Sequence, residues 1–189
     1  KLRPLKIQVL GEGAQPGAYT VSPSTTLFSA LYYFNGPTKS GSLREIQLIR
    51  NGEVVGEIDF YDYLLTGKKP NDQKLQLGDV IFVPRRLKTV SIRGAINRSG
   101  IYELKPDEDF YDLINIAGNL KVTAYLNRAS IDRIVPFADR LKKGMDRIVL
   151  DANLKNIFEK KDKFSLQDGD YITIYSIFDQ RQNVVYVDG

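Results

Sequence analysis

Carboxylates are the side chains in this sequence best suited to acid–base chemistry, because its 189 residues include no Cys and no His. That composition excludes thiol nucleophiles, disulfides, imidazole catalysis and the usual zinc ligands. Glycan-cleaving enzymes hold two carboxylates on either side of the bond that breaks. Three groups here have the right residue types: Glu57 with Asp59, Asp107-Glu108-Asp109, and Asp168 with Asp170.

Each of these carboxylate groups also has a structural interpretation. Glu57 with Asp59 fits a strand edge, the second group fits the start of a helix, and the third surrounds a glycine turn. The sequence brings no second catalytic group near any of them. The segment Asp168-Gly169-Asp170 lacks the further oxygen ligands of a calcium loop. We therefore predict a protein that is not an enzyme and that uses no metal and no cofactor.

The glycine-rich segment Gly11-Glu12-Gly13-Ala14-Gln15-Pro16-Gly17 superficially resembles a phosphate-binding loop. Such a loop ends in Lys-Ser or Lys-Thr and opens a helix, whereas this segment contains Pro16 and leads into a strand pattern. Its glycines are therefore interpreted as turn residues.

Seven residues are candidates for binding a ligand or a partner: Tyr19, Arg85, Arg86, Arg93, Asn97, Arg98 and Tyr102. The tyrosines could stack on sugar rings or lie at a subunit interface. The alternative is a half-buried strand tyrosine whose hydroxyl faces water. The arginines could pair with acidic sugars or with a neighbouring subunit's carboxylates, and the alternative is an ordinary surface charge.

A repeated strand–turn–strand pattern positions most of these candidates. It occurs at Ile7–Tyr19 and again at Val90–Tyr102, shifted by 83 residues, and a truncated third copy is expected at Val185, Val187 and Gly189. The copies differ at Arg93, Asn97 and Arg98, which makes these three the sharper binding candidates. The residues expected to shape the repeated turns are Gly11, Pro16, Gly17, Gly78, Asp79, Gly94, Gly100, Gly169 and Asp170.

Apolar residues at helical spacing follow each opening pattern and predict one short helix per unit. The helix N-caps are Thr26 and Asp109, and the stop signals are Asn35-Gly36-Pro37 and Gly118-Asn119. The apolar faces are Leu27, Ala30, Leu31 and Phe34 in the first unit, and Phe110, Leu113, Ile114 and Ala117 in the second.

A strand pair, a second short helix and a closing strand complete each unit. The strand pair turns at Asn51-Gly52 in the first unit, and the second unit carries about eight extra residues, expected within Pro136–Asp146. The closing strands follow Gly78-Asp79 and Gly169-Asp170. The second helices are predicted from Phe60, Tyr63 and Leu64, and from Leu150, Leu154 and Ile157.

A helix held across a small mixed sheet is a β-grasp arrangement. The predicted fold class is therefore α+β, with two tandem β-grasp-like domains at residues 1–87 and 88–181. Residues 182–189 are expected to form the first strand of a truncated third repeat or a C-terminal extension. The linker is Arg85-Arg86-Leu87-Lys88.

The charge and hydropathy of the chain narrow its possible partners. The net charge of +4 divides into +3 up to residue 87 and +1 beyond it, so neither unit is a basic module and nucleic acid is not an expected partner. No apolar run approaches the roughly 20 residues that span a bilayer. Because the chain begins with Lys1, we interpret it as a soluble piece of a longer protein.

The ordered recurrence of these motifs resembles the soluble ligand-binding β-grasp (SLBB) domain. The resemblance is carried by a strand ending in Gly, a Pro-Gly or Ser-Gly turn before Tyr, a helix ending near Ala117-Gly118-Asn119, and the closing segment Leu75–Pro84. Serial copies look like the Wza-type outer-membrane polysaccharide export proteins of Gram-negative bacteria. The chain departs from that family's pattern in lacking its N-terminal export domain, its lipid-anchoring Cys and its membrane segment, and in carrying Arg98-Ser99 before Gly100.

The resemblance implies a non-enzymatic domain pair of a longer membrane-anchored protein. The pair would lie on the periplasmic side of the outer membrane, within an oligomeric channel that exports capsular polysaccharide or exopolysaccharide. It implies self-association of the full-length protein, contact with the polysaccharide, and an inner-membrane polysaccharide co-polymerase as a further partner. The alternative is a carbohydrate-binding or small-ligand-binding module with no transport role.

Overall fold

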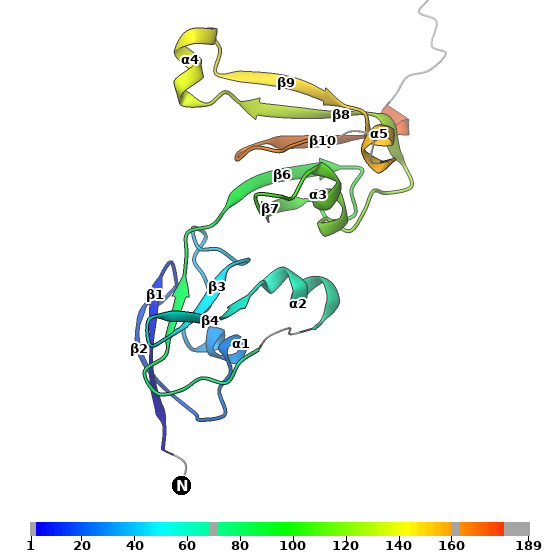
Figure 1. Cartoon of the computed structure of the whole chain (residues 1–189). Coiled ribbons are helices and arrows are strands. Elements are labelled where there is room, and N and C mark those ends of the chain that lie inside the picture. Colours follow the sequence, from blue (N-terminus) through cyan, green and yellow to red (C-terminus); the bar gives the residue numbers. More distant parts are fainter. Residues whose placement is uncertain (1–2, 69–71, 160–162, 180–189) are drawn as a thin grey trace, which may run out of the picture. The chain divides into compact units, whose positions relative to one another are not determined.

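The computed structural model describes residues 3–68, 72–159 and 163–179, and the chain divides into two compact units, Lys1–Leu87 and Lys88–Gly189 (Figure 1). Each unit contains one five-stranded mixed sheet with short helices. The predicted α+β class with two β-grasp-like domains is therefore confirmed. The truncated third repeat predicted at Val185, Val187 and Gly189 lies outside the described residues.

The first unit has the strand order β2-β1-β5-β3-β4, in which β1 and β5 run parallel and all other neighbours run antiparallel. The predicted Asn51-Gly52 hairpin turn is confirmed, with φ values of 51° and 86° at the two residues. The elements are β1 (Leu5–Gly11), β2 (Gly17–Val21), α1 (Leu27–Ala30), the 3-10 helix η1 (Leu31–Tyr33), β3 (Ile46–Arg50), β4 (Glu53–Ile58), α2 (Phe60–Thr66) and β5 (Val80–Val83).

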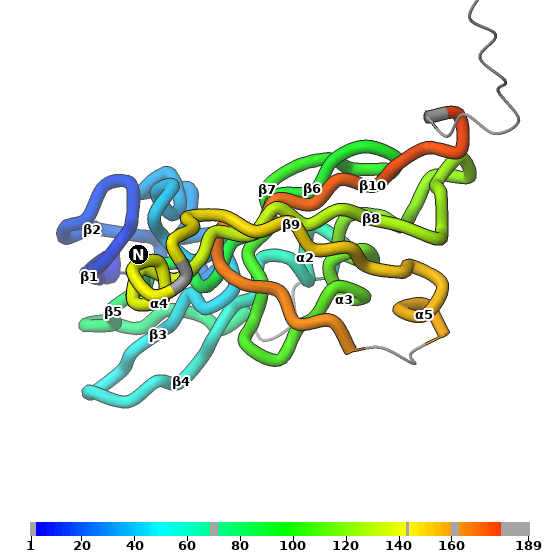
Figure 2. The backbone as a smooth tube through the Cα atoms, turned by 90° about the horizontal axis from the view of Figure 1, so that it is seen from above, coloured from blue at the N-terminus to red at the C-terminus, as the bar shows by residue number. Residues whose placement is uncertain are grey.

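The second unit repeats this topology in the order β7-β6-β10-β8-β9, with β6 and β10 parallel. Figure 2 shows α3 and α5 on the same side of its strands. Its elements are β6 (Lys88–Gly94), β7 (Gly100–Leu104), α3 (Phe110–Ile116), β8 (Ala124–Ile134), α4 (Phe137–Lys143), β9 (Arg147–Ala152), α5 (Leu154–Phe158), β10 (Tyr171–Ser176) and the 3-10 helix η2 (Ile177–Asp179).

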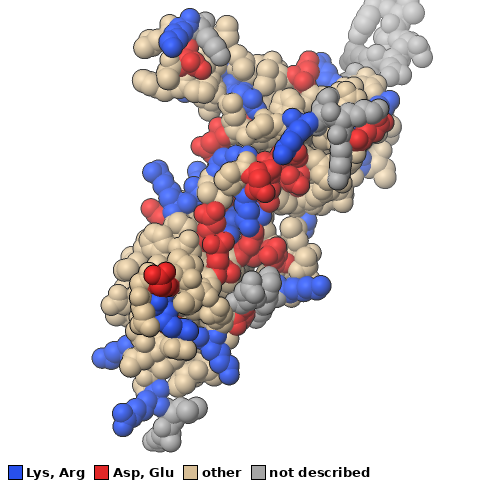
Figure 3. All heavy atoms as spheres, viewed as in Figure 1, with Lys and Arg blue, Asp and Glu red and all other residues tan. Residues whose placement is uncertain are grey.

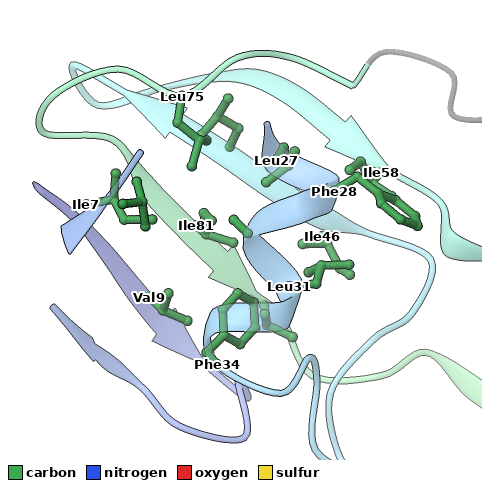
Figure 4. Close-up of a cluster of buried hydrophobic side chains, with 14 residues drawn as sticks. Ile7, Val9, Leu27, Phe28, Leu31, Phe34, Ile46, Ile58, Leu75 and Ile81 are labelled. Carbon is green, nitrogen blue, oxygen red and sulfur yellow. The ribbon is translucent and has the colours of Figure 1, made fainter. Parts of the chain in front are cut away.

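The core of the first unit lies between its sheet and the α1–η1 segment (Figure 4). Thr26 caps α1 and shares a reciprocal capping box with Ser29, which satisfies backbone N–H groups that the short helix leaves free. The α-helix passes into a 3-10 turn at Leu31, yet the apolar face predicted for one helix stays intact. Leu27, Ala30, Leu31 and Phe34 are all buried.

The core of the second unit is organised by α3. Asp109 accepts hydrogen bonds from the backbone of Tyr111 and Asp112 and so caps the helix as predicted. Residues with left-handed backbone end the helical segment of each unit, at Asn35-Gly36 and at Gly118-Asn119. The four residues predicted to form the apolar face, Phe110, Leu113, Ile114 and Ala117, are fully buried.

The second unit departs from the first between its strands β8 and β9. The extra residues fall within Pro136–Asp146, as predicted, and there they form the helix α4. The prediction that Leu150 belongs to the second helix is wrong, because Leu150 lies in β9 and pairs with Ile131. The helix α5 starts only after Asn153, whose side chain accepts a hydrogen bond from the Asn156 backbone. Across the described ranges, no helix has the length and apolar character needed to cross a membrane.

Candidate functional site

The two predicted tyrosines hold the first turn of each unit closed. The Tyr19 hydroxyl donates to the Gln15 carbonyl at 2.6 Å, and the Tyr102 hydroxyl donates to the Arg98 carbonyl at 2.7 Å. Both rings are half-buried. Burial raises the pKa of the Tyr102 phenol, and the neighbouring Arg98 cation lowers it by less. The hydroxyls therefore have a structural partner in the turn.

Two of the predicted turn glycines, Gly11 and Gly94, are required because the neighbouring parallel strand leaves no space for a side chain. Gly11 and Gly94 have φ values of 79° and 94°, and an added Cβ would lie 2.2 Å from the Val83 carbonyl oxygen and 2.1 Å from that of Ile174. Such contacts are sterically forbidden, so only glycine lets these parallel strands pair so closely. Gly17 has a φ of 148° with open space around it. Pro16 is exposed in the first turn, and Gly100 is exposed at the start of β7.

Asn97 and Arg98 bind the C-terminal end of α3. The Asn97 side-chain amide donates to the Gly118 carbonyl at 2.7 Å, and the Arg98 guanidinium donates to the Ile116 carbonyl at 2.9 Å. Free carbonyls at a helix C-terminus are stabilised by such donors. These two residues, which the sequence marks as specific to the second repeat, therefore attach its opening turn to its helix.

The Gly-Asp turns are built on buried ion pairs that the sequence interpretation missed. Asp79 is fully buried and accepts two hydrogen bonds of 2.8 Å from Arg50, whose pKa this hydrogen bonding raises. Asp170 is also fully buried and accepts bonds of 2.9 and 2.7 Å from Arg133. Gly78 and Gly169 precede them with φ values of 85° and 81°.

Three other carboxylates considered for catalysis, Asp59, Asp109 and Asp168, also have local bonding partners. Asp59 caps α2 and pairs with the buried Arg44 at 2.8 Å. Asp109 caps α3, and Asp168 accepts a 2.7 Å hydrogen bond from the Thr89 backbone. In the described part of the chain, no three acidic residues are grouped as a metal site would require.

The predicted arginines lie in different places. Arg85 forms a β-bridge with Gly41, and the Arg86 guanidinium donates to the Lys39 carbonyl at 3.2 Å. Arg93 is exposed on β6, where its Nε donates to the Thr173 hydroxyl at 3.3 Å and its guanidinium carbon lies 4.7 Å from the centre of the Tyr171 ring. Arg93 therefore lies on the face of the sheet. The other three candidates of the second unit, Asn97, Arg98 and Tyr102, form their bonds at the turn instead.

A pocket of about 330 Å³ opens beside α1 in the first unit, and no sequence motif indicated it. Its wall is mainly carbon, so it suits an apolar group better than a sugar, whose hydroxyls would lose their water there. Its lining residues are Phe28, Leu31, Tyr32, Asn35, Gly36, Pro37, Leu43 and Phe60.

Comparison with known domains decides the family. Residues 6–58 and 89–145 each match the SLBB domain. This chain belongs to the SLBB domain family. The two SLBB matches cover β1–β4 in the first unit and β6–α4 in the second, so the closing strands β5 and β10 and the buried Asp79 and Asp170 lie beyond the matched ranges.

Two curated proteins of Escherichia coli, both named polysialic acid transport protein KpsD, are similar to this SLBB tandem. Each is 32% identical to it over 104 residues. The aligned stretch covers 54% of this chain but 18% of each relative. The chain therefore corresponds to a small part of the length of these proteins.

Proposed function

We propose that this tandem is the SLBB portion of a polysaccharide export protein and that it acts without catalysis. One observation carries the proposal: two consecutive SLBB units occur in a chain that is 32% identical, over 104 residues, to a polysialic acid transport protein. The bonds of the two buried carboxylates support a scaffold, because Asp79 pairs with Arg50 and Asp170 pairs with Arg133, and each pair fixes a Gly-Asp turn.

The mechanism we propose is geometric. Two small sheets, each closed by a buried ion pair, offer edges and loops to neighbouring copies, and head-to-tail contacts of this kind close into rings. The edges of the two sheets are formed by β2 and β4, and by β7 and β9. Such a ring, on the periplasmic side of the outer membrane, would surround the passage of a capsular polysaccharide or exopolysaccharide and meet an inner-membrane co-polymerase.

The mixed signs of the surface charges support a scaffold along which an acidic polymer can move without binding tightly. On the visible face of each unit, basic and acidic side chains are interspersed, with no extended field of one sign (Figure 3). An extended basic field would retain an acidic polymer and would also recruit nucleic acid. The net charge of +4 over 189 residues is correspondingly small.

Removal of the tandem from the protein that carries it tests the proposal. An in-frame deletion of residues 1–189 is expected to leave polymer synthesis intact and to abolish polysaccharide at the cell surface, with polymer accumulating inside the cell envelope. Light scattering of the carrier protein in detergent is expected to show a closed oligomer. Normal surface polysaccharide in the deletion strain, or a strictly monomeric carrier protein, would refute the proposed role.

A carbohydrate-binding module without a transport role is the second candidate. The contact of Arg93 with Tyr171 favours it, since it places a cation that can pair with an acidic sugar next to an aromatic side chain on the exposed sheet face. This candidate predicts that the tandem binds a sugar polymer while surface polysaccharide persists in the deletion strain.

A further inference from the structure

The outer face of the second sheet carries a line of aromatic and hydroxyl side chains along β10. Ile172 and Ile174 point into the core, so Tyr171, Thr173 and Tyr175, which alternate with them, lie on the opposite face. All three are partly exposed. At a rise of about 3.3 Å per residue, the two tyrosines are about 13 Å apart along the strand.

The neighbouring strands extend this line into two rows across the sheet. The register of β6, β10, β8 and β9 places directly opposed residues side by side on one face. The rows are Ser91, Tyr171, Asp132 and Val149, and then Arg93, Thr173, Ser130 and Asp151. We call these two rows, with Tyr175 and Arg128, the outer strip.

Arg93 is a cation of the outer strip that has no acidic partner among the described residues. Asp151 pairs with Arg128 at 2.8 Å, and Asp132 lies 3.7 Å from Arg147. Both aspartates of the strip therefore already have a cationic neighbour. Within residues 3–68, 72–159 and 163–179, no acidic side chain pairs with Arg93, so its charge is available to a ligand.

The Arg93 guanidinium is also held in a defined position. The Thr173 hydroxyl accepts from its Nε, and the Tyr171 ring lies beneath it at 4.7 Å. A carboxylate binds arginine best through two parallel N–H groups, and the terminal nitrogens of Arg93 have no hydrogen-bond partner among the described residues. Because the side chain is already ordered, binding loses less conformational entropy than it would with a free surface arginine.

The first unit lacks this arrangement at the same place in its sheet. Leu10 and Phe82 pair across β1 and β5 where Arg93 and Thr173 pair across β6 and β10. The shared fold therefore does not require a cation or a hydroxyl there. The outer strip is a property of the second unit alone.

We infer that the outer strip binds an acidic polysaccharide, with Arg93, held over the Tyr171 ring, pairing with a sugar carboxylate. Arginine lies over both tyrosine rings of the strip, so the rings offer their apolar rims and hydroxyl tips to a sugar, which has both carbon and hydroxyl groups. The identity of the polymer rests on the proposed function, since the relatives are named for transport of polysialic acid, an acidic sugar chain.

Titration of the full chain with short oligomers of sialic acid, followed by amide NMR shifts and calorimetry, tests the inference. A neutral glucose oligomer of similar length serves as the control ligand. We expect the acidic oligomer to shift signals of β6 and β10, with binding that weakens as salt rises. Arg93→Gln is expected to weaken binding about tenfold, the effect of losing one charge-assisted hydrogen-bonded pair.

Two further variants distinguish binding at the Arg93 site from non-specific attraction of the acidic oligomer by the positive charge of the chain. Lys6→Gln makes the same change in net charge at an exposed position of the first unit and is expected to leave binding unchanged. Thr173→Val keeps a β-branched strand residue but removes the hydroxyl that holds Arg93. Because Thr173 only orients Arg93 and does not contact the ligand, we expect this variant to weaken binding by a smaller factor, about threefold. Amide spectra of the free variants establish that each one folds.

Three outcomes would overturn the inference: no binding of the acidic oligomer, equal binding of the neutral one, or equal losses in Lys6→Gln and Arg93→Gln. The deletion experiment distinguishes this failure from failure of the proposed function. If surface polysaccharide is lost on deletion while the chain binds no acidic oligomer, the export role stands and the outer strip is not its contact. If the chain binds through Arg93 while export persists after deletion, the site stands and the export role fails.

Discussion

Arg50 and Asp79 form a two-point ion pair in which the carboxylate is fully buried and the arginine side chain is 22% exposed. The same pair recurs as Arg133 and Asp170 in the second unit. Each aspartate also accepts a backbone hydrogen bond from a residue three positions earlier, at 2.7 and 2.8 Å. The pair therefore joins the end of the β3 or β8 strand to the turn before the closing strand.

Removing the arginine should cost much more stability than removing an exposed one. Arg50→Met leaves the buried Asp79 carboxylate without its cation, and we expect the free energy of unfolding to fall by about 3–5 kcal/mol. Arg128→Met is the control, because Arg128 and Asp151 are both more than half exposed, and surface pairs contribute little. Urea denaturation measures both changes.

The double variant Arg50→Met with Asp79→Leu sharpens this test. Replacing both charges with apolar groups removes the unpaired carboxylate, so the double variant should be more stable than Arg50→Met alone. A double variant that is no more stable than the single one would show that the pair acts through something other than charge compensation.

Gly94 should be far less tolerant of a side chain than Gly144, although both have a positive φ. Gly144→Ala places its Cβ in open space and costs only the left-handed backbone penalty of about 1 kcal/mol. Gly94→Ala adds a collision with the Ile174 carbonyl oxygen at 2.1 Å, so we expect a loss of about 3 kcal/mol or more. Amide NMR during denaturation follows the second unit, and equal losses would contradict the steric explanation.

Tyr102 should ionise at a higher pH than an ordinary tyrosine, because burial raises its pKa. A group whose folded pKa is raised stabilises the fold fully below the unfolded pKa of about 10, and this contribution is lost as the pH rises through the folded value. The difference in phenolate absorbance between the unaltered chain and Tyr102→Phe gives the titration of this residue.

Arg98→Gln provides the matched control for that titration. The Arg98 cation lowers the pKa of Tyr102, so its removal should move the midpoint further upward. A midpoint that moves downward in Arg98→Gln would mean that loss of the turn geometry outweighs loss of the charge.

The repeated parts of the fold were accessible from the sequence because local rules determine them. The Thr26 and Asp109 caps, the Asn51-Gly52 turn and the two buried helical faces all follow from residues a few positions apart. The same caps, turns and apolar faces recur 83 residues later with different side chains. This recurrence gave each prediction a second, independent observation.

The ion pairs and the outer strip were not accessible in the same way, because they depend on pairing across the sheet. Arg50 and Asp79 are 29 residues apart and Arg133 and Asp170 are 37 apart, so no local pattern joins them. One signal was present: Arg133 follows Arg50 at the repeat shift of 83. Tyr171, the partner of Arg93, was overlooked for the same reason, whereas Leu150 was misplaced because an alternating strand and a short helix share apolar spacings.

The helix α4 should be dispensable for folding of the second unit. Its apolar residues Phe137 and Leu141 are 80% and 91% exposed, so they bury little area. Replacing residues 135–146 with Asn-Gly joins the paired residues Ile134 and Arg147 by a two-residue turn, as in the β3–β4 hairpin. The shortened chain loses the burial of Val135, and we expect the free energy of unfolding to fall by no more than about 2 kcal/mol.

Replacement with Ala-Ala is the control for this shortening. A two-residue hairpin turn of this kind needs positive φ at both positions, which Asn and Gly adopt and alanine resists by about 1–2 kcal/mol per residue. The Ala-Ala chain should therefore be less stable than the Asn-Gly chain in urea denaturation, while both keep the amide pattern of β6 and β10. Loss of that pattern in the Asn-Gly chain would mean that α4 supports the sheet, despite the exposure of its apolar side chains.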